Sequence, residues 1–208
     1  MDALAGLPSP LWILGTDTGV GKTFVAAAIA RAWAAEGPVV YRKPFQTGVQ
    51  GHGDPEADQA QVAGPGIEVE TGLCLLAPLS PLAAAEAEGR QVDMAALHAW
   101  CVRPVPAGAR LLLEGVGGVM VPLPAPPPKH GTHFAAWGAD LRFPALLVAR
   151  GGLGTLNHAL LSAEALMLRG WRLAAVLLNP GLDGSHDAAR ANAEILSRFL
   201  PMPVRVLE

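Results

Sequence analysis

The residues best suited to chemistry form one glycine-rich run, Gly15-Thr-Asp-Thr-Gly-Val-Gly-Lys-Thr23. It lies between the apolar residues 11–14 and a helical pattern that begins at Phe24. Glycine permits turns that point backbone N–H groups into one concavity, and the N-terminus of the following helix adds its positive end. The pair Lys22-Thr23 at this place is typical of a loop that binds nucleotide phosphates and Mg²⁺. The alternative, an ordinary glycine turn, is disfavoured because strand, turn and helix stand in the required order.

A carboxylate stands at the end of another apolar run. Glu114 closes residues 111–113 and is followed by Gly115, Gly117 and Gly118. A carboxylate at a strand end beside a phosphate loop is a usual Mg²⁺ ligand, and glycines permit close approach of the backbone to a ligand. The alternative is a solvated charge at a strand end, and we favour the ligand.

Lysine is scarce in this chain. Of the 15 basic residues, only Lys22, Lys43 and Lys129 are lysines. Lys43 follows the apolar residues 39–41, where its ammonium group can reach a bound anion, and Thr47 adds a hydroxyl. A compact ammonium and a planar guanidinium are not interchangeable at such a site. From the residues alone, an anion-binding role for Lys43 and a surface position are equally supported.

Two further features permit two interpretations each, and a third permits one. Residues 151–158 form a second glycine-rich junction before a helix, which either receives an anion such as a carboxylate or is a tight turn that Thr155 caps. Asn179 either reads an adenine edge or serves a turn. Asp58, judged alone, is a surface helix residue.

Composition narrows the class of protein. The chain has 208 residues, 51% hydrophobic and 16% charged, with a formal net charge of −3. This disfavours disorder and a general nucleic-acid binder. No apolar run reaches the roughly 18–20 residues of a membrane span, no basic N-terminal signal is present, and two cysteines are too few for a disulfide scaffold. We therefore predict a soluble, cytoplasmic protein.

Apolar runs alternate with helical stretches along the chain. Strands are predicted at 11–14, 39–41, 73–76, 111–113, 145–149, 173–178 and 204–206. Helices are predicted at 24–36, 81–88, 92–100, 156–168 and 185–200, together with a short helix that ends at 62. The pattern predicts a single α/β domain, residues 1–208, with a parallel sheet that carries helices on both faces. Ligands bind at the carboxyl ends of such strands, so the polar clusters should converge there. The proline-rich residues 124–132 are predicted to form a surface loop or lid.

These motifs, in this order along nearly the whole chain, resemble the dethiobiotin synthetase family. The phosphate loop is similar to that family's form, including its displaced first glycine, since Thr16 takes the place of the first glycine in the general pattern. The other matching motifs are Lys43-Pro-Phe-Gln-Thr-Gly48, Asp58-Gln-Ala60, Ser80-Pro81, Glu114-Gly-Val-Gly-Gly118, Gly154-Thr-Leu-Asn-His158 and Asn179.

The resemblance implies a P-loop NTPase-like fold, a homodimer with sites near the subunit interface, and a reaction. In it 7,8-diaminononanoate, CO₂ and ATP give dethiobiotin, ADP and phosphate, with Mg²⁺. By resemblance, the catalytic residues would be Lys43, Lys22, Thr18 and Thr47, and the metal ligands Thr23, Asp58 and Glu114. The nucleotide would meet Gly19, Val20, Gly21, Lys22, Thr23, Phe24, Glu114, Gly117, Gly118 and Asn179. The substrate would meet Thr18, Lys43, Thr47, Gly117, Gly118, Gly151, Gly152, Leu153, Gly154, Thr155 and Asn157, those after 150 from the neighbouring subunit.

Three departures from the family's pattern bear on these expectations. Gly151 and Gly152 stand where some relatives carry a lysine, so carboxylate binding would depend more on backbone groups. Residues 134–137 lack an aspartate that relatives often have. The chain ends at Glu208, whereas relatives usually continue into a loop near the adenine, so base selectivity is expected to be looser.

Three other classes of protein fit the sequence less well. A partition or septum-site ATPase would carry a signature lysine where Asp17 stands. An amide-forming enzyme of the cobyrinic acid diamide type needs a glutaminase domain, for which this chain has no room. A non-enzymatic nucleotide-binding module would not need both Lys43 and Glu114.

Overall fold

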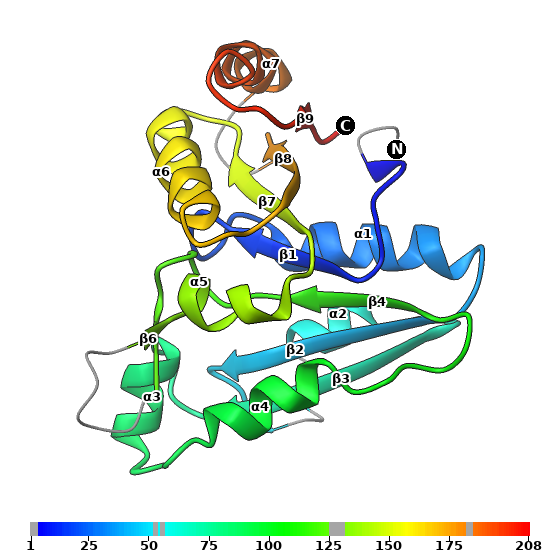
Figure 1. Ribbon diagram of the computed structural model, residues 1–208, viewed down its shortest axis with the longest axis vertical. Coiled ribbons are helices and arrows are strands. Elements are labelled where there is room, and N and C mark those ends of the chain that lie inside the picture. Colours follow the sequence, from blue (N-terminus) through cyan, green and yellow to red (C-terminus); the bar gives the residue numbers. More distant parts are fainter. Residues whose placement is uncertain (1–3, 52–53, 55–56, 125–131, 182–184) are drawn as a thin grey trace.

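One parallel sheet organises the molecule. The computed structural model describes residues 4–51, 54, 57–124, 132–181 and 185–208. In this part of the chain, seven strands form the sheet in the order β3-β2-β4-β1-β7-β8-β9, and all neighbours pair in parallel (Figure 1). A short antiparallel ribbon of β5 and β6 lies beside it. The first strand, β1, lies between β4 and β7, where the chain order reverses, and ligands of such sheets bind at this switch point.

The strands of the main sheet are β1 (Leu11–Gly15), β2 (Val39–Thr47), β3 (Ile67–Leu75), β4 (Arg110–Glu114), β7 (Ala145–Arg150), β8 (Leu173–Asn179) and β9 (Val204–Val206), and the ribbon is β5 (Pro122–Leu123) with β6 (Thr132–His133). The helices are α1 (Lys22–Ala34), α2 (Asp58–Val62), α3 (Pro81–Ala87), α4 (Met94–Cys101), α5 (Phe134–Trp137), α6 (Thr155–Met167) and α7 (His186–Leu196), with a 3₁₀ turn at Ala139–Leu141.

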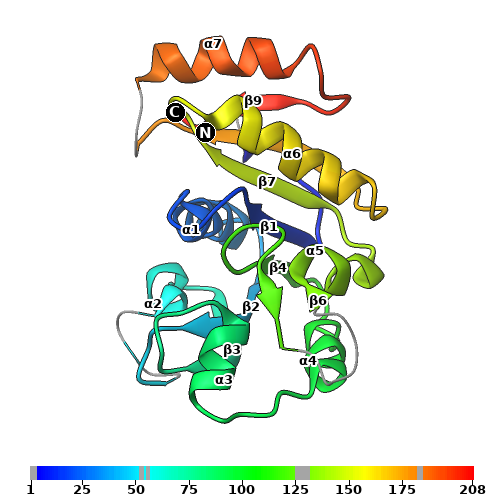
Figure 2. The same ribbon diagram turned by 90° about the vertical axis from the view of Figure 1, so that its left-hand side faces the viewer.

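Helices cover both faces of the sheet, as predicted. Figure 2 shows α1 and α2 on one side and α4, α5 and α6 on the other. Alternate residues of β1 divide between the two cores: Leu11 and Ile13 pack with α1, whereas Trp12 and Leu14 pack with α5 and α6. Successive strand side chains point to opposite faces, so a strand buried on both sides carries an unbroken apolar run.

Two strands are longer than the sequence pattern predicts. β2 continues to Thr47 and β3 begins at Ile67, because the two strands pair in register from Val39 with Ile67 to Thr47 with Leu75. Arg42 faces Glu70 across this pair and its Nε donates to the Glu70 carboxylate. Charged residues that pair across strands hide the apolar signal by which a strand is recognised. Lys43 therefore lies inside β2, and the prediction that it follows the strand is wrong.

Other local predictions hold. Ser185 is the N-cap of α7, where its Oγ accepts a hydrogen bond from the N–H of Ala188 at 3.1 Å. Most of the proline-rich stretch predicted as a loop or lid, residues 125–131, lies outside the described residues. No helix in the described part of the chain is both long and apolar enough to cross a membrane.

Candidate functional site

The glycine-rich run joins β1 to α1. Gly19 and Gly21 have φ values of 74° and 92°, a left-handed conformation that glycine adopts without strain, and Gly21 is the N-cap of α1. The Lys22 side chain extends back over the loop. Its Nζ donates hydrogen bonds to the carbonyl oxygens of Asp17 and Gly117, each at 2.9 Å. Burial lowers the pKa of Lys22 from 10.5 to about 8, although the nearby Glu114 carboxylate opposes the shift. The lysine lies where a phosphate loop requires it.

Glu114, at the end of β4, is the centre of a buried polar cluster. Its Oε1 accepts hydrogen bonds from Thr23 Oγ1 at 2.8 Å and from Lys43 Nζ at 2.7 Å. Its Oε2 accepts from the Tyr41 hydroxyl at 2.9 Å. Glu114 is 1% exposed. A buried carboxylate requires partners of this kind, and the alternative of a solvated strand-end charge is wrong.

Lys43 is clamped between two carboxylates. Besides Glu114, its Nζ forms an ion pair with Asp58, at the start of α2. Burial works to lower the pKa of Lys43, but Glu114 and Asp58 together outweigh burial and raise it above 10.5. The residue is 3% exposed, so the interpretation as a surface lysine is wrong. Asp58, which alone looks like a surface residue, is drawn into the cluster by the same contact.

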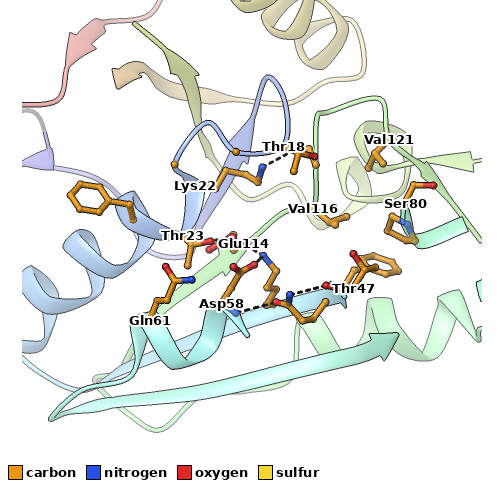
Figure 3. Close-up of a pocket in the computed structure, with 18 of the residues that line it drawn as sticks. Thr18, Lys22, Thr23, Thr47, Asp58, Gln61, Ser80, Glu114, Val116 and Val121 are labelled. Atoms are coloured by element: carbon orange, nitrogen blue, oxygen red, sulfur yellow. Dashed lines mark hydrogen bonds and ion pairs between the residues drawn. The ribbon is translucent and has the colours of Figure 1, made fainter. Parts of the chain in front are cut away.

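A pocket of about 950 Å³ opens above this cluster. Figure 3 shows Thr23, Glu114 and Asp58 lying together beneath it, with Lys22 nearby. The predicted site residues that line the pocket are Thr18, Gly19, Gly21, Lys22, Thr23, Phe24, Lys43, Thr47, Asp58, Glu114, Gly117 and Asn179. The polar residues that follow β1 and those in the carboxyl-terminal parts of β2, β4 and β8 thus converge at one edge of the sheet.

Some predicted residues lie elsewhere. Val20 is buried in the core beneath α1. Gly118 lines a neighbouring hollow of about 430 Å³, together with Asp17 and His158. A Cβ at Gly118 would meet the carbonyl oxygen of Thr16 at 2.9 Å, so this glycine is required where the loop after β4 packs against the phosphate loop. The close approach is to the chain's own backbone.

The second glycine-rich junction does not line the large pocket. Leu153 is fully exposed, whereas Gly151 and Gly152 are buried. Gly154 is the N-cap of α6, and the Thr155 hydroxyl donates to the carbonyl of Arg150 at 2.6 Å. Thr155 is therefore not the cap that the turn interpretation predicts.

Asn179 uses both ends of its amide within the chain. Its Nδ2 donates to the carbonyl of Val20 at 3.2 Å, and its Oδ1 accepts from the N–H of Gly181 at 3.1 Å. The second contact is the turn role that the sequence left open. The residue also lines the pocket, so contact with a base remains a prediction.

Three polar residues of this region were missed in the sequence analysis. Gln46 and Gln61 line the pocket, and Tyr41 holds Glu114 from below. Gln61 follows Asp58 by three residues, a spacing that places both on one helix face. Tyr41 precedes Lys43 by two, so the two share a face of β2. These spacings can be recognised in the sequence. They show which residues share a face, but not which strand or helix that face contacts.

The donor set suits a hard cation. Two carboxylates, from Asp58 and Glu114, and the hydroxyl of Thr23 meet at the base of the pocket beside Lys22. Mg²⁺ prefers such oxygen ligands and usually shares them with substrate phosphates. The residues present fit Mg²⁺.

A parallel sheet whose first strand leads through a glycine loop into a helix opening with Lys22-Thr23 defines the P-loop NTPase class. McdA from Cyanothece, solved in a complex with ATP, has this fold: it superposes with a TM-score of 0.54 at 14% identity, covering 94% of this chain and 81% of that chain. A family model described as an AAA domain matches residues 10–206.

Relatives with higher sequence identity identify the family more specifically than the fold does. The chain is 43% identical to the ATP-dependent dethiobiotin synthetase of Anaeromyxobacter dehalogenans over 193 residues, covering 91% of this chain and 84% of the relative. It is 37% identical to the ATP-dependent dethiobiotin synthetase of Methylobacterium nodulans over 214 residues, covering 96% and 92%. The chain belongs to the dethiobiotin synthetase family.

Proposed function

We propose that this chain is an ATP-dependent dethiobiotin synthetase that acts in biotin biosynthesis. One amine of 7,8-diaminononanoate takes up CO₂ as a carbamate, releasing a proton. A carbamate oxygen then attacks the γ-phosphate and expels ADP, giving a mixed carbamic–phosphoric anhydride. The second amine attacks the carbonyl carbon, closes the ureido ring and expels phosphate. The steps need positioning and neutralisation of charge more than covalent help from the protein.

The observation that carries the proposal is the Lys43 ammonium buried between Glu114 and Asp58 at the edge of the phosphate-loop pocket. A nucleotide-binding loop by itself implies no reaction. A second buried cation beside Lys22 supplies positive charge where a carbamate oxygen would meet a γ-phosphate. Thr18 and Thr47 line the same pocket and offer hydroxyls to the reacting groups.

The nucleotide would lie across the phosphate loop. Residues 19–24 would surround the phosphates with backbone N–H groups and the Lys22 ammonium, with Glu114, Gly117 and Gly118 beside them. Asn179 would lie beside the adenine base. We propose only a loose preference for adenine, because the Asn179 side-chain amide already forms hydrogen bonds with Val20 and Gly181. Mg²⁺ bound to Thr23, Asp58 and Glu114 would supply charge neutralisation at the β and γ phosphates.

The second junction is proposed to serve a neighbouring subunit. Gly151, Gly152, Leu153, Gly154, Thr155 and Asn157 would receive the substrate carboxylate in a homodimer. Support comes from their place: Leu153 and Asn157 are exposed at the N-terminus of α6, outside the large pocket. Residues 1–208 are proposed to act as one domain, supported by the seven-stranded sheet in which β1 to β4 pair continuously with β7 to β9. The proposed compartment is the cytoplasm.

The test is an assay of the purified protein with 7,8-diaminononanoate, bicarbonate, Mg²⁺ and ATP, with ADP release and dethiobiotin mass measured together. We expect one ADP for each dethiobiotin. The matched control omits diaminononanoate. ADP release equal to that of the control, with no dethiobiotin, would refute the proposal.

A further inference from the structure

Tyr41 is the only tyrosine in the chain, and it is fully buried beneath the site. It does not line the pocket. Its hydroxyl nevertheless donates to Glu114 Oε2 at 2.9 Å, across 73 residues of sequence. The rest of its ring packs in the apolar core beneath α1. In this apolar core, the hydrogen bond to Glu114 gives the Tyr41 hydroxyl a fixed direction.

The sheet dictates this contact. β2 and β4 are neighbours, with Tyr41 opposite Leu112 and Arg42 opposite Leu113. Tyr41 and Lys43 are two residues apart and point to the same face of β2. Glu114 lies one step beyond that register, on the same face, within reach of both side chains.

The two oxygens of Glu114 are thereby given different tasks. Oε1 accepts from Thr23 and Lys43, the two groups that line the pocket. Oε2 accepts from Tyr41, which does not. A carboxylate can rotate about its last bond, and the Tyr41 hydroxyl opposes that rotation by favouring one orientation. Without that hydroxyl, Oε2 would be left in an apolar core with one donor fewer.

We propose that Tyr41 is a positioning residue that fixes the Glu114 carboxylate so that Oε1 faces the pocket, ready for a divalent cation and the phosphates. This inference deepens the proposed function and rests on it for the identity of the reaction. Tyr41 acts through Glu114 and touches no substrate. The outer partners of metal ligands commonly affect metal affinity or activity by about 10–100-fold.

The first test is Tyr41→Phe, which removes one oxygen and keeps the ring. We expect the Mg²⁺ concentration for half-maximal turnover to rise about tenfold or more, while KM for diaminononanoate is unchanged. Leu146→Val is the matched control, because Leu146 is fully buried in the same core and makes no polar contact with Glu114. If Leu146→Val shifts the Mg²⁺ dependence as far as Tyr41→Phe, Tyr41 merely stabilises the fold.

The second test needs neither activity nor a variant. Because the chain has one tyrosine, protein labelled with ¹³C at tyrosine Cζ gives one resonance for this position. We expect that resonance to move when Mg²⁺ is added to protein saturated with a non-hydrolysable ATP analogue, and to return when EDTA is added. A resonance indifferent to Mg²⁺ overturns the proposal even if Tyr41→Phe fails to fold. A Mg²⁺-dependent shift in a protein that makes no dethiobiotin would retain the positioning role and reject the reaction.

Discussion

Two glycine-rich junctions, one after β1 and one after β7, have nearly the same local design. Each ends in a left-handed N-cap glycine, Gly21 with φ 92° and Gly154 with φ 89°. In each helix the next residue is buried, Lys22 at 7% and Thr155 at 1% exposure. Neither helix has an acidic residue in its first turn. Both backbones could therefore present N–H groups to an anion.

Their surroundings differ. The first junction lies at the switch point, where β4 supplies Glu114, the loop after β4 supplies the carbonyl of Gly117, and β2 supplies Lys43. A pocket of about 950 Å³ results. At the second junction the polar atom of Thr155 is turned to the Arg150 carbonyl, and Leu153 is fully exposed. Within the described residues, no comparable cluster of buried charges surrounds it.

A glycine turn before a helix is therefore not sufficient by itself to make an anion site. The same local geometry becomes a strong site only where neighbouring strands add buried charge. Variants at or beside each junction test this difference.

The largest effect is expected from Lys43→Arg. The guanidinium is larger and planar, and the space between Glu114 and Asp58 is buried. Arginine keeps the charge but cannot place it as lysine does. Removal of one correctly placed donor at a developing anion typically costs about 10²–10³ in kcat, and we expect about that loss. The protein should still fold, as circular dichroism and thermal unfolding can check. Arg150→Lys is the control at the second junction, and near-normal turnover in Lys43→Arg would remove Lys43 from the chemistry.

Next come Gly21→Ala and Gly154→Ala. Both force alanine into a left-handed conformation, at about 1–2 kcal/mol of strain. In the nucleotide-free variant the loop can relax out of this conformation, and ATP binding must restore it. Each 1.4 kcal/mol is a factor of about ten in affinity, so Gly21→Ala should weaken ATP binding about tenfold. Gly154→Ala should leave ATP affinity unchanged and raise KM for diaminononanoate. Calorimetric titration with an ATP analogue distinguishes the two, and equal losses of ATP affinity would contradict the separation of roles.

The third prediction concerns pH. Lys22 has a pKa lowered to about 8 by burial, so the nucleotide-free protein loses this charge above pH 8. Phosphate favours the charged form, so ATP affinity should fall as pH rises above 8, by at most about tenfold per pH unit. Stability without nucleotide changes in the opposite sense: between pH 8 and 10.5 the unfolded chain alone holds this proton, so stability rises with pH. The Lys22→Arg variant stays charged, so it should bind ATP weakly and without this pH dependence. If its ATP affinity falls with pH as steeply as that of the unmodified protein, a group other than Lys22 titrates.

The smallest effect is expected at the ion pair that joins the two junctions. Arg150 Nη2 lies 3.6 Å from Asp17 Oδ2, with side chains 31% and 57% exposed. Such pairs contribute about 0–1 kcal/mol, so Arg150→Gln should shift Tm by only a few degrees at most. Arg190→Gln is the matched control, since Arg190 Nη2 also lies 3.6 Å from a carboxylate oxygen, that of Glu208. A much larger shift for Arg150→Gln would show that the junctions are coupled.

Local chemistry made much of this fold predictable. The alternation of apolar runs with helical stretches gave the parallel sheet, and Ser185 was identified as the N-cap of α7 because an N-cap is a contact between near neighbours. The carboxyl-terminal part of β2 and the first residues of β3 were not predicted. These segments carry polar side chains, and they are strand because β2 and β3 pair along their length, Arg42 with Glu70 among the pairs.

The sequence by itself determined the phosphate loop, because its glycines, lysine and threonine act through the backbone that immediately surrounds them. It also marked Lys43 and Glu114 as candidates. Only the tertiary structure decided that the two side chains touch, 71 residues apart, with Asp58 on one side and Tyr41 beneath. The reason is physical: such contacts depend on which strands are neighbours and in what register, and hydrophobic periodicity encodes the existence of a strand and not its partner.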